Sequence, residues 1–179
     1  MTDQELLKQL RDPITRHSAF GLLVSLYKQR LYWHIRKIVI AHSDADDVLQ
    51  NVFIKIYQNI EQFKGDSQLF TWMYKIATNE SLSFLKSQSR RHFRTIDNLQ
   101  SILVNNLKAD VYFEGNDIQI KLQQAIARLP QKQKLIFNMR YFDEIKFKDM
   151  SEILGTSEGA LKASYHIAMK KIEKYMTSN

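Results

Sequence analysis

Glycine and proline are scarce in this chain, and that scarcity constrains its fold more than any other feature. Only five glycines and two prolines occur in 179 residues. These two residue types supply most tight turns and interrupt helices. A chain with so few of them favours long helices and argues against a turn-rich β protein. Because 44% of the residues are hydrophobic, the helices can bury a core rather than remain disordered.

Several classes of protein are excluded by what the sequence lacks. It has no cysteine, so disulfides, thiolate zinc sites and thiol nucleophiles are ruled out. No apolar run approaches the ~20 residues that a membrane span needs, and the polar N-terminus differs from a signal peptide. We therefore expect a cytoplasmic protein without membrane insertion, built as one domain or two small ones.

The positive charge is concentrated toward the C-terminus. Residues 119–179 contain 11 basic and 6 acidic side chains, whereas residues 1–87 contain 11 and 9. A basic excess favours a polyanionic partner such as nucleic acid. A basic surface that only keeps the protein soluble explains the charge equally well.

The first half of the chain predicts helices over about 3–10 and 17–41, then a third helix capped by Ser43. The acidic run after Ser43 complements the positive end of that helix and lacks further ligands at calcium-loop spacing, so we interpret it as structural. It comprises Asp44, Asp46 and Asp47. An apolar stripe follows at helical spacing. Asp47, Gln50, Asn51 and Ile54 fall mostly outside that stripe, and an exposed isoleucine beside amides suits a protein contact.

A Lys-Gly-Asp turn and Ser67 as a cap predict the next helix, over about 68–87. Most of its rings fit one core face. A second, narrow stripe spans roughly 80° of the helical wheel. It comprises Trp72, Lys75, Asn79, Ser83 and Lys86. Rings stack on unpaired bases, lysines neutralise phosphates and amides read base edges, so the stripe suits single-stranded nucleic acid. A half-buried tryptophan on an ordinary polar face is the alternative, and composition alone favours it.

The second half predicts a helix-turn-helix. Residues 88–117 are the least periodic and indicate a linker, in which LQSILVNNL suits a short helix. A helix over about 146–154 should end at Gly155 in a left-handed turn, and Ser157 should cap the next helix. That last helix packs one face and exposes another, as a major-groove helix must. The packed face comprises Leu161, Tyr165, Ala168 and Ile172. The exposed residues are Lys162, Ala163, His166 and Lys170. A generic helical hairpin with a basic outer face remains open.

Several motifs together resemble a known family. The run DDVLQNVF, then FKGDS, FTWMYKIA and RLP, occur in the order and approximate spacing of the extracytoplasmic-function (ECF) sigma factors. These belong to the sigma-70 family of bacterial transcription initiation factors. The resemblance covers roughly residues 20–91 and 119–175. It implies an all-α protein of two helical domains: region 2 over 1–91 and a region 4 helix-turn-helix over 119–179, with a linker over 92–118.

The resemblance also implies partners and contact residues. The partners are core RNA polymerase, through its β′ coiled coil and β flap, promoter DNA and an anti-sigma factor. Asp47, Gln50, Asn51 and Ile54 match the helix that grips the β′ coiled coil. The matches at the −10 element are the loop residues Lys64, Gly65, Asp66 and Ser67, followed by Trp72, Lys75 and Asn79, with Lys86 on the same stripe. The matches at the −35 element are Lys162, Ala163 and His166, with Ser157, Glu158 and Lys170 on the same helix.

This chain departs from the family pattern at two places. Asn51 stands where the family usually has glutamate, so one charge-assisted contact to a basic partner is expected to be missing. In the last helix, LKASYHIA replaces a pattern richer in arginine and serine. Lys162 is then the main candidate for reading guanine, and Ala163 suits a thymine methyl. The −35 sequence should therefore differ from that of arginine-rich relatives.

Two other functions compete with a sigma factor. A helix-turn-helix regulator would bind duplex DNA without polymerase, but it would not need the motifs over 44–79. A nucleic-acid-processing enzyme has weak support, because the acidic run lacks paired acids or a phosphate loop. We expect no catalytic residues, no metal site and no cofactor. His166 is interpreted as a base or phosphate contact, since no second ligand shares its face.

Overall fold

The computed structural model describes residues 2–91 and 116–178, and within these ranges every regular element is a helix. The predicted all-α class is therefore confirmed. The helices form two compact units, the first made mainly of Met1–Ser87 and the second mainly of the C-terminal helices. Most of the predicted linker over 92–118, with its short helix, lies outside the described residues.

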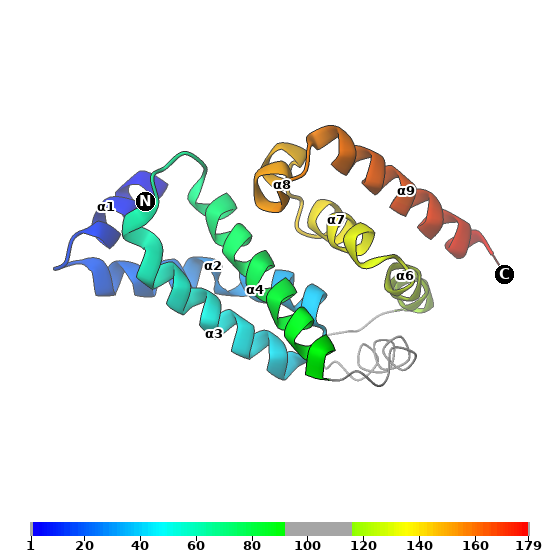
Figure 1. Cartoon of the computed structure of the whole chain (residues 1–179), viewed down its shortest axis with the longest axis horizontal. Helices are drawn as coiled ribbons and strands as arrows, with labels where there is room; N and C mark the ends of the chain where they lie inside the picture. Colours follow the sequence, from blue (N-terminus) through cyan, green and yellow to red (C-terminus); the bar gives the residue numbers. More distant parts are fainter. Residues whose placement is uncertain (1, 92–115, 179) are drawn as a thin grey trace. The chain divides into compact units, whose positions relative to one another are not determined.

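Four α-helices and one short 3-10 helix make up the first unit (Figure 1). They are α1 (Asp3–Arg11), α2 (Arg16–Val39), α3 (His42–Asn59), the 3-10 helix η1 (Ile60–Gln62) and α4 (Leu69–Arg91). Thr2 begins α1 with a capping box: its hydroxyl accepts from the Glu5 N–H at 3.3 Å, and the Glu5 carboxylate accepts from the Thr2 N–H at 2.8 Å. The Thr2 backbone hydrogen bond lowers the pKa of Glu5.

Two of the predicted helix starts are shifted by one or two residues. The helix α3 begins at His42 after Ala41, so Ser43 lies inside its first turn and is not the cap. His42 Nδ1 lies 2.9 Å from the Asp46 carboxylate across that turn, a contact that helical spacing brings within reach. The helix α4 begins at Leu69, and the Gln68 carbonyl accepts its first hydrogen bond, from Trp72. Ser67 therefore precedes the capping position by one residue.

The core of the first unit is apolar with one polar seam between α2 and α4. Leu31, Ile35, Ile56 and Met73 are fully buried, as the helical periodicity predicts. His34 Nε2 lies 2.8 Å from the Thr78 hydroxyl, which itself donates to the Tyr74 carbonyl at 2.7 Å. Since that hydroxyl has only one proton, His34 is the donor in its contact with Thr78. Buried polar groups that are paired in this way fix the register of the two helices.

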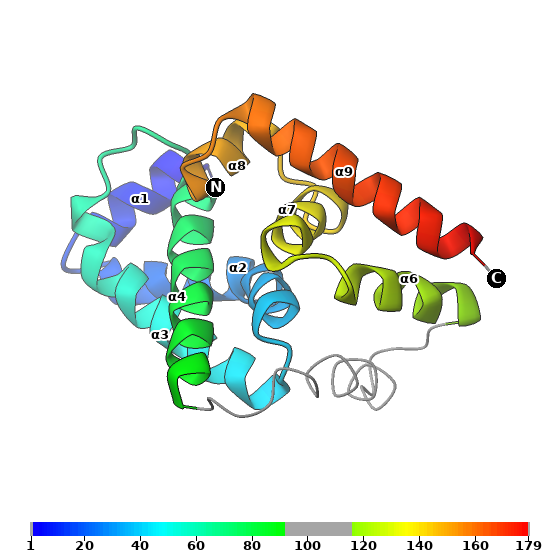
Figure 2. The ribbon, with the colours of Figure 1, turned by 45° about the vertical axis from the view of Figure 1, so that its right-hand side comes forward.

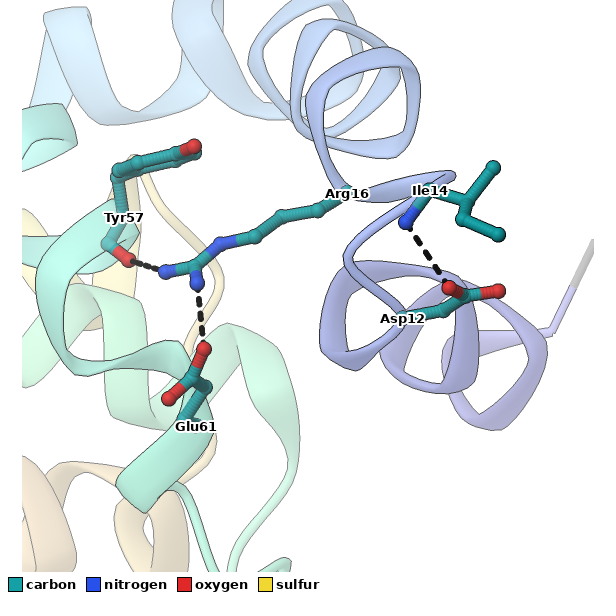
Figure 3. A network of polar contacts seen from close by, with 5 residues as sticks. All are labelled: Asp12, Ile14, Arg16, Tyr57 and Glu61. Carbon is teal, nitrogen blue, oxygen red and sulfur yellow. Dashed lines mark hydrogen bonds and ion pairs between the residues drawn. The ribbon is translucent and has the colours of Figure 1, made fainter.

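Arg16 joins the start of α2 to the end of α3 (Figure 3). Its guanidinium donates to the Tyr57 carbonyl at 2.7 Å and pairs with the Glu61 carboxylate. It also lies 4.5 Å from the centroid of the Tyr57 ring. A planar guanidinium with several donors can hold a carbonyl, a carboxylate and a ring face together. The contact therefore joins three parts of the first unit: the start of α2, the end of α3 and η1.

The second unit consists of α6 (Asp117–Ala127), α7 (Gln131–Tyr141), α8 (Phe147–Leu154) and α9 (Glu158–Thr177). Figure 2 shows α8 turning sharply into α9. Gly155 at this turn has φ +62, the left-handed conformation that the sequence predicts. Buried residues of α6, α7 and α9 share one core, which includes Ile126, Phe137 and Ala168. The second unit therefore has an apolar core of its own.

Candidate nucleic-acid and protein interfaces

One face of α3 is exposed along several turns and carries the four candidate partner residues. They are Asp47, Gln50, Asn51 and Ile54, and each is exposed. At about 100° per residue they fall within roughly 100° of one another. Val48 and Val52, which alternate with them, are buried in the first unit. Ile54 remains 47% exposed, so α3 presents an apolar side chain among polar ones. We call these four residues the α3 face.

The loop before α4 is anchored at its first residue and exposed beyond it. Phe63 is buried, and its carbonyl accepts from the Arg11 guanidinium of α1. Lys64, Gly65 and Asp66 then lie at the surface, while Ser67 is half-buried. Gly65 has φ +84, a conformation that glycine adopts without strain. The anchored Phe63 thus holds a short exposed turn in place, with one cation and one carboxylate on it.

Trp72 connects this loop to α4. Its ring is half-buried and lies 5.1 Å from the Phe63 ring, centroid to centroid. Lys75, Asn79, Ser83 and Lys86 follow along α4, and all four are exposed. The structure therefore places the polar members of the predicted stripe at the surface, and Trp72 at the point where the stripe meets the loop. We call Trp72, Lys75, Asn79, Ser83 and Lys86 the α4 stripe.

The last helix, α9, divides into a packed and an exposed side. Ser157 caps it, accepting from the Ala160 N–H at 3.3 Å as predicted. Leu161, Ala168 and Ile172 are buried, and Tyr165 is half-buried against the core. The exposed side carries the six candidate duplex contacts: Ser157, Glu158, Lys162, Ala163, His166 and Lys170. An exposed polar side on a helix that follows a tight turn is the arrangement that fits a major groove.

Lys162 has one neighbour on its own helix and one on another. Its ammonium lies 3.6 Å from the Glu158 carboxylate, one turn earlier in α9, as helical periodicity predicts for residues four apart. It also lies 5.9 Å from the centroid of the Phe147 ring, and the Arg140 guanidinium lies 5.4 Å from the same centroid. The Phe147 ring therefore has two cations near it. Because Arg140, Phe147 and Lys162 lie on three different helices, the periodicity of a single helix carries no signal for these contacts.

Clusters of metal-ligating side chains and membrane-length apolar helices are both absent from the part of the chain that the structure describes. No group of three or more histidine, aspartate or glutamate side chains there is arranged to hold a metal ion. None of the helices within residues 2–91 and 116–178 is long and apolar enough to cross a membrane.

Burial lowers the pKa of Lys134 on α7. That lysine lies outside the three surfaces described above.

Family models match both units. The model described as Sigma-70 region 2 matches residues 23–91, and the model described as Sigma-70, region 4 matches residues 119–172. The chain is 27% identical to the ECF RNA polymerase sigma-E factor of Haemophilus influenzae, over 97% of this chain and 94% of that protein. It is 24% identical to the ECF RNA polymerase sigma factor SigW of Bacillus subtilis, over 88% and 89%.

Solved structures show the same fold. The structure of CnrH in complex with the cytosolic domain of CnrY has a TM-score of 0.70 at 19% identity, and covers 96% of this chain and 95% of that one. The sigma factor RpoE in complex with the anti-sigma factor NepR from Bartonella quintana has a TM-score of 0.69 at 17% identity, with coverages of 89% and 98%. At these identities the likeness concerns the fold.

Proposed function

This chain belongs to the sigma-70 family of RNA polymerase sigma factors, in the ECF branch, and from that premise we propose how its surfaces act in transcription initiation. It delivers core RNA polymerase to a promoter, reads the −10 and −35 elements and opens the DNA. The observation that supports this proposal is that one chain exposes two polar helix faces of different composition, one on α9 and one on α4. The exposed side of α9 suits a duplex, whereas the α4 stripe suits unpaired bases.

The α3 face is the proposed contact with the β′ coiled coil of the polymerase. Asp47 offers a carboxylate to a basic partner, Gln50 and Asn51 offer amides, and Ile54 supplies apolar area. Aliphatic area surrounded by polar groups is common at protein interfaces. Asn51 contributes no charge where the family usually has glutamate. Asp47 therefore provides most of the electrostatic attraction on this face.

The loop over 64–67 and the α4 stripe are the proposed −10 site. Gly65 lets the backbone turn closely around an extruded nucleobase, while Trp72 offers an aromatic ring where the loop joins α4. Lys75 and Lys86 neutralise phosphates, and Asn79 offers an amide to a base edge. Unstacking a base costs a few kcal/mol, and stacking on an aromatic ring returns about 1–3 kcal/mol. Polymerase contacts supply the rest, so opening needs no ATP.

The exposed side of α9 is the proposed −35 site. Lys162 donates to guanine, Ala163 contacts a thymine methyl, and His166 lies one turn further along the helix. Ser157 and Glu158 lie at the start of the helix, next to the major groove of the DNA, and Lys170 neutralises a phosphate further along the helix.

The proposed domains are region 2 over 1–91, a linker over 92–118 and region 4 over 119–179. The protein acts in the cytoplasm, has no catalytic activity of its own, and an anti-sigma factor restrains it.

The −10 assignment predicts that the protein prefers single strands and that Asn79 discriminates between bases in them. The full-length protein should bind a −10 non-template single strand more tightly than the same sequence as duplex, because only unpaired bases reach the stripe. Asn79→Ala should reduce discrimination at one base position by about 1–3 kcal/mol, the value of a lost edge contact. Fluorescence anisotropy with labelled strands measures both effects. Asn51→Ala, the same change at an exposed position of α3, should leave strand discrimination unaltered.

A duplex-binding regulator would give the opposite result. If the wild-type protein prefers the duplex, and Asn79→Ala binds every strand variant as wild type does, the stripe is an ordinary polar helix face. Permanganate footprinting of the polymerase complex then provides an independent check, because it detects unpaired thymines in the opened promoter.

The −35 assignment predicts that two lysines of α9 differ in effect. Lys162→Ala should relax the base preference by about 1–3 kcal/mol at one position. Lys170→Ala should weaken all sequences alike and reduce the dependence of affinity on salt by about one released counterion. Titrations of −35 duplex variants at several salt concentrations separate the two results. Equal effects of both substitutions on every sequence would refute Lys162 as the reader.

A further inference from the structure

Phe147, the first residue of α8, lies beside a residue of the proposed −35 site although it belongs to a different helix. The Lys162 ammonium of α9 lies 5.9 Å from the centroid of the Phe147 ring, and the Arg140 guanidinium of α7 lies 5.4 Å from it. An aromatic face attracts a cation that lies within about 6 Å of its centroid. Through this ring, α8 therefore contacts the residue of α9 that is proposed to read guanine.

The Phe147 ring is held in place by the core of the second unit. It meets the Tyr165 ring edge to face, with centroids 5.8 Å apart, and Tyr165 stacks on the buried Phe137. The backbone two residues before Phe147 is fixed as well, since Ile145 is buried and its carbonyl accepts from the Arg140 guanidinium at 3.4 Å. The ring thus has a defined position before any DNA binds.

Lys162 lies between this ring and a carboxylate. Its ammonium is 3.6 Å from the Glu158 carboxylate, one turn earlier in α9. An exposed ion pair of this kind contributes little by itself, and a lysine side chain has a flexible four-carbon stem. The Phe147 ring adds a second contact, and two contacts together restrict the stem more than either does alone. Lys162 therefore loses less side-chain entropy when it binds DNA.

The same contacts leave Lys162 accessible to a base. Its side chain is 60% exposed, and its ammonium has three N–H donors. Because the ring attracts the positive charge as a whole, N–H groups that point away from the ring can donate to O6 and N7 of guanine. The Phe147 ring and a guanine can thus contact Lys162 at the same time.

We propose that Phe147 is a positioning residue for base recognition at the −35 element: its ring holds the Lys162 ammonium where it can donate to guanine. This rests on the proposed function, since α9 is its duplex-reading helix. The six residues assigned above to the −35 element lie on α9 or cap it. Phe147 adds a residue of α8, which contacts no base itself and acts through Lys162.

Phe147→Leu tests the proposal, because it removes the ring and keeps an apolar side chain. The position to examine is the −35 base pair at which Lys162→Ala relaxes the preference for guanine. There the full-length Phe147→Leu protein should discriminate against other bases about twofold to fivefold less than wild type does, the range that an exposed cation–π contact contributes. Phe147→Tyr keeps a ring and should discriminate as wild type does. Fluorescence anisotropy with duplexes that differ at this one base pair measures the ratio.

Phe142→Leu is the matched control, because Phe142 is another partly exposed ring of the second unit and meets Phe137 edge to face. It should discriminate as wild type does. In the Lys162→Ala background, Phe147→Leu should cause no further loss of discrimination, because its effect passes through Lys162. An equal loss in the wild-type and Lys162→Ala backgrounds would overturn the proposal.

A second measurement does not depend on how well Phe147→Leu folds. Replacing Phe147 with pentafluorophenylalanine keeps the shape of the ring but removes the negative potential of its face, which attracts the cation. This replacement should reduce discrimination at the same base pair. Discrimination equal to that of wild type would show that the ring acts by packing alone, and would refute the positioning role.

Lys162→Ala separates the failure of this inference from the failure of the proposed function. If Lys162→Ala relaxes the base preference while Phe147→Leu and the fluorinated ring retain it, α9 still reads the −35 element and only the role of Phe147 is refuted. If Lys162→Ala changes no base preference, the assignment of Lys162 as the reader fails, and the role of Phe147 fails with it.

Discussion

Asp47→Arg is expected to weaken binding to core RNA polymerase by about 100-fold or more, and to lower run-off transcription in proportion at limiting protein. The substitution reverses the principal charge of the α3 face, and like charges brought together at an interface cost several kcal/mol. A 100-fold loss corresponds to about 2.7 kcal/mol. Asp47 is exposed, so the helix should form as before. Labelled protein titrated with core polymerase measures the affinity.

The control for Asp47→Arg is Asp3→Arg, which makes the same charge change at an exposed carboxylate on α1. It should leave polymerase affinity close to wild type. Circular dichroism establishes that both variants are folded. A folded Asp47→Arg that binds core polymerase as tightly as wild type would show that the α3 face is misassigned.

Phe137→Ala should unfold the second unit selectively. Phe137 is 1% exposed and contacts three other rings: it stacks on Tyr141 and Tyr165, and meets Phe142 edge to face. Removing a buried phenylalanine costs about 3–5 kcal/mol, most of the stability of a small domain. The first unit has a separate core and should remain folded. The variant should therefore lose −35 duplex binding and keep its preference for −10 single strands.

Calorimetry of the full-length variant tests this result directly. We expect a low-temperature transition from the second unit and an almost unchanged transition from the first. Phe142→Ala is the matched control, because that ring is 39% exposed and its loss should cost much less. A single transition that shifts as a whole would contradict the independence of the two units.

Much of the fold could be predicted from the sequence, because helix periodicity and helix ends are local properties. The scarcity of glycine and proline indicated long helices, and the structure has them. Gly155 and Ser157 mark the turn before α9 because a left-handed residue and a hydroxyl cap act within a few residues of their own positions. The predicted caps Ser43 and Ser67 were wrong by one or two residues. Local composition does not decide between adjacent capping positions.

The candidate surfaces also have features that the sequence predicts and features that it does not. Which side of α3, α4 and α9 is polar follows from the sequence alone, since a 3.6-residue period defines the faces of a single helix. What lies beside each face depends on tertiary packing. An apolar groove in the first unit is lined by Phe20 and Val24 of α2 together with Ile54 of α3. In the second unit, Arg140 and Lys162 come from different helices to the ring of Phe147. A helical period defines directions around one axis. Which helix packs in a given direction depends on long-range contacts, and that packing built the groove from two helices.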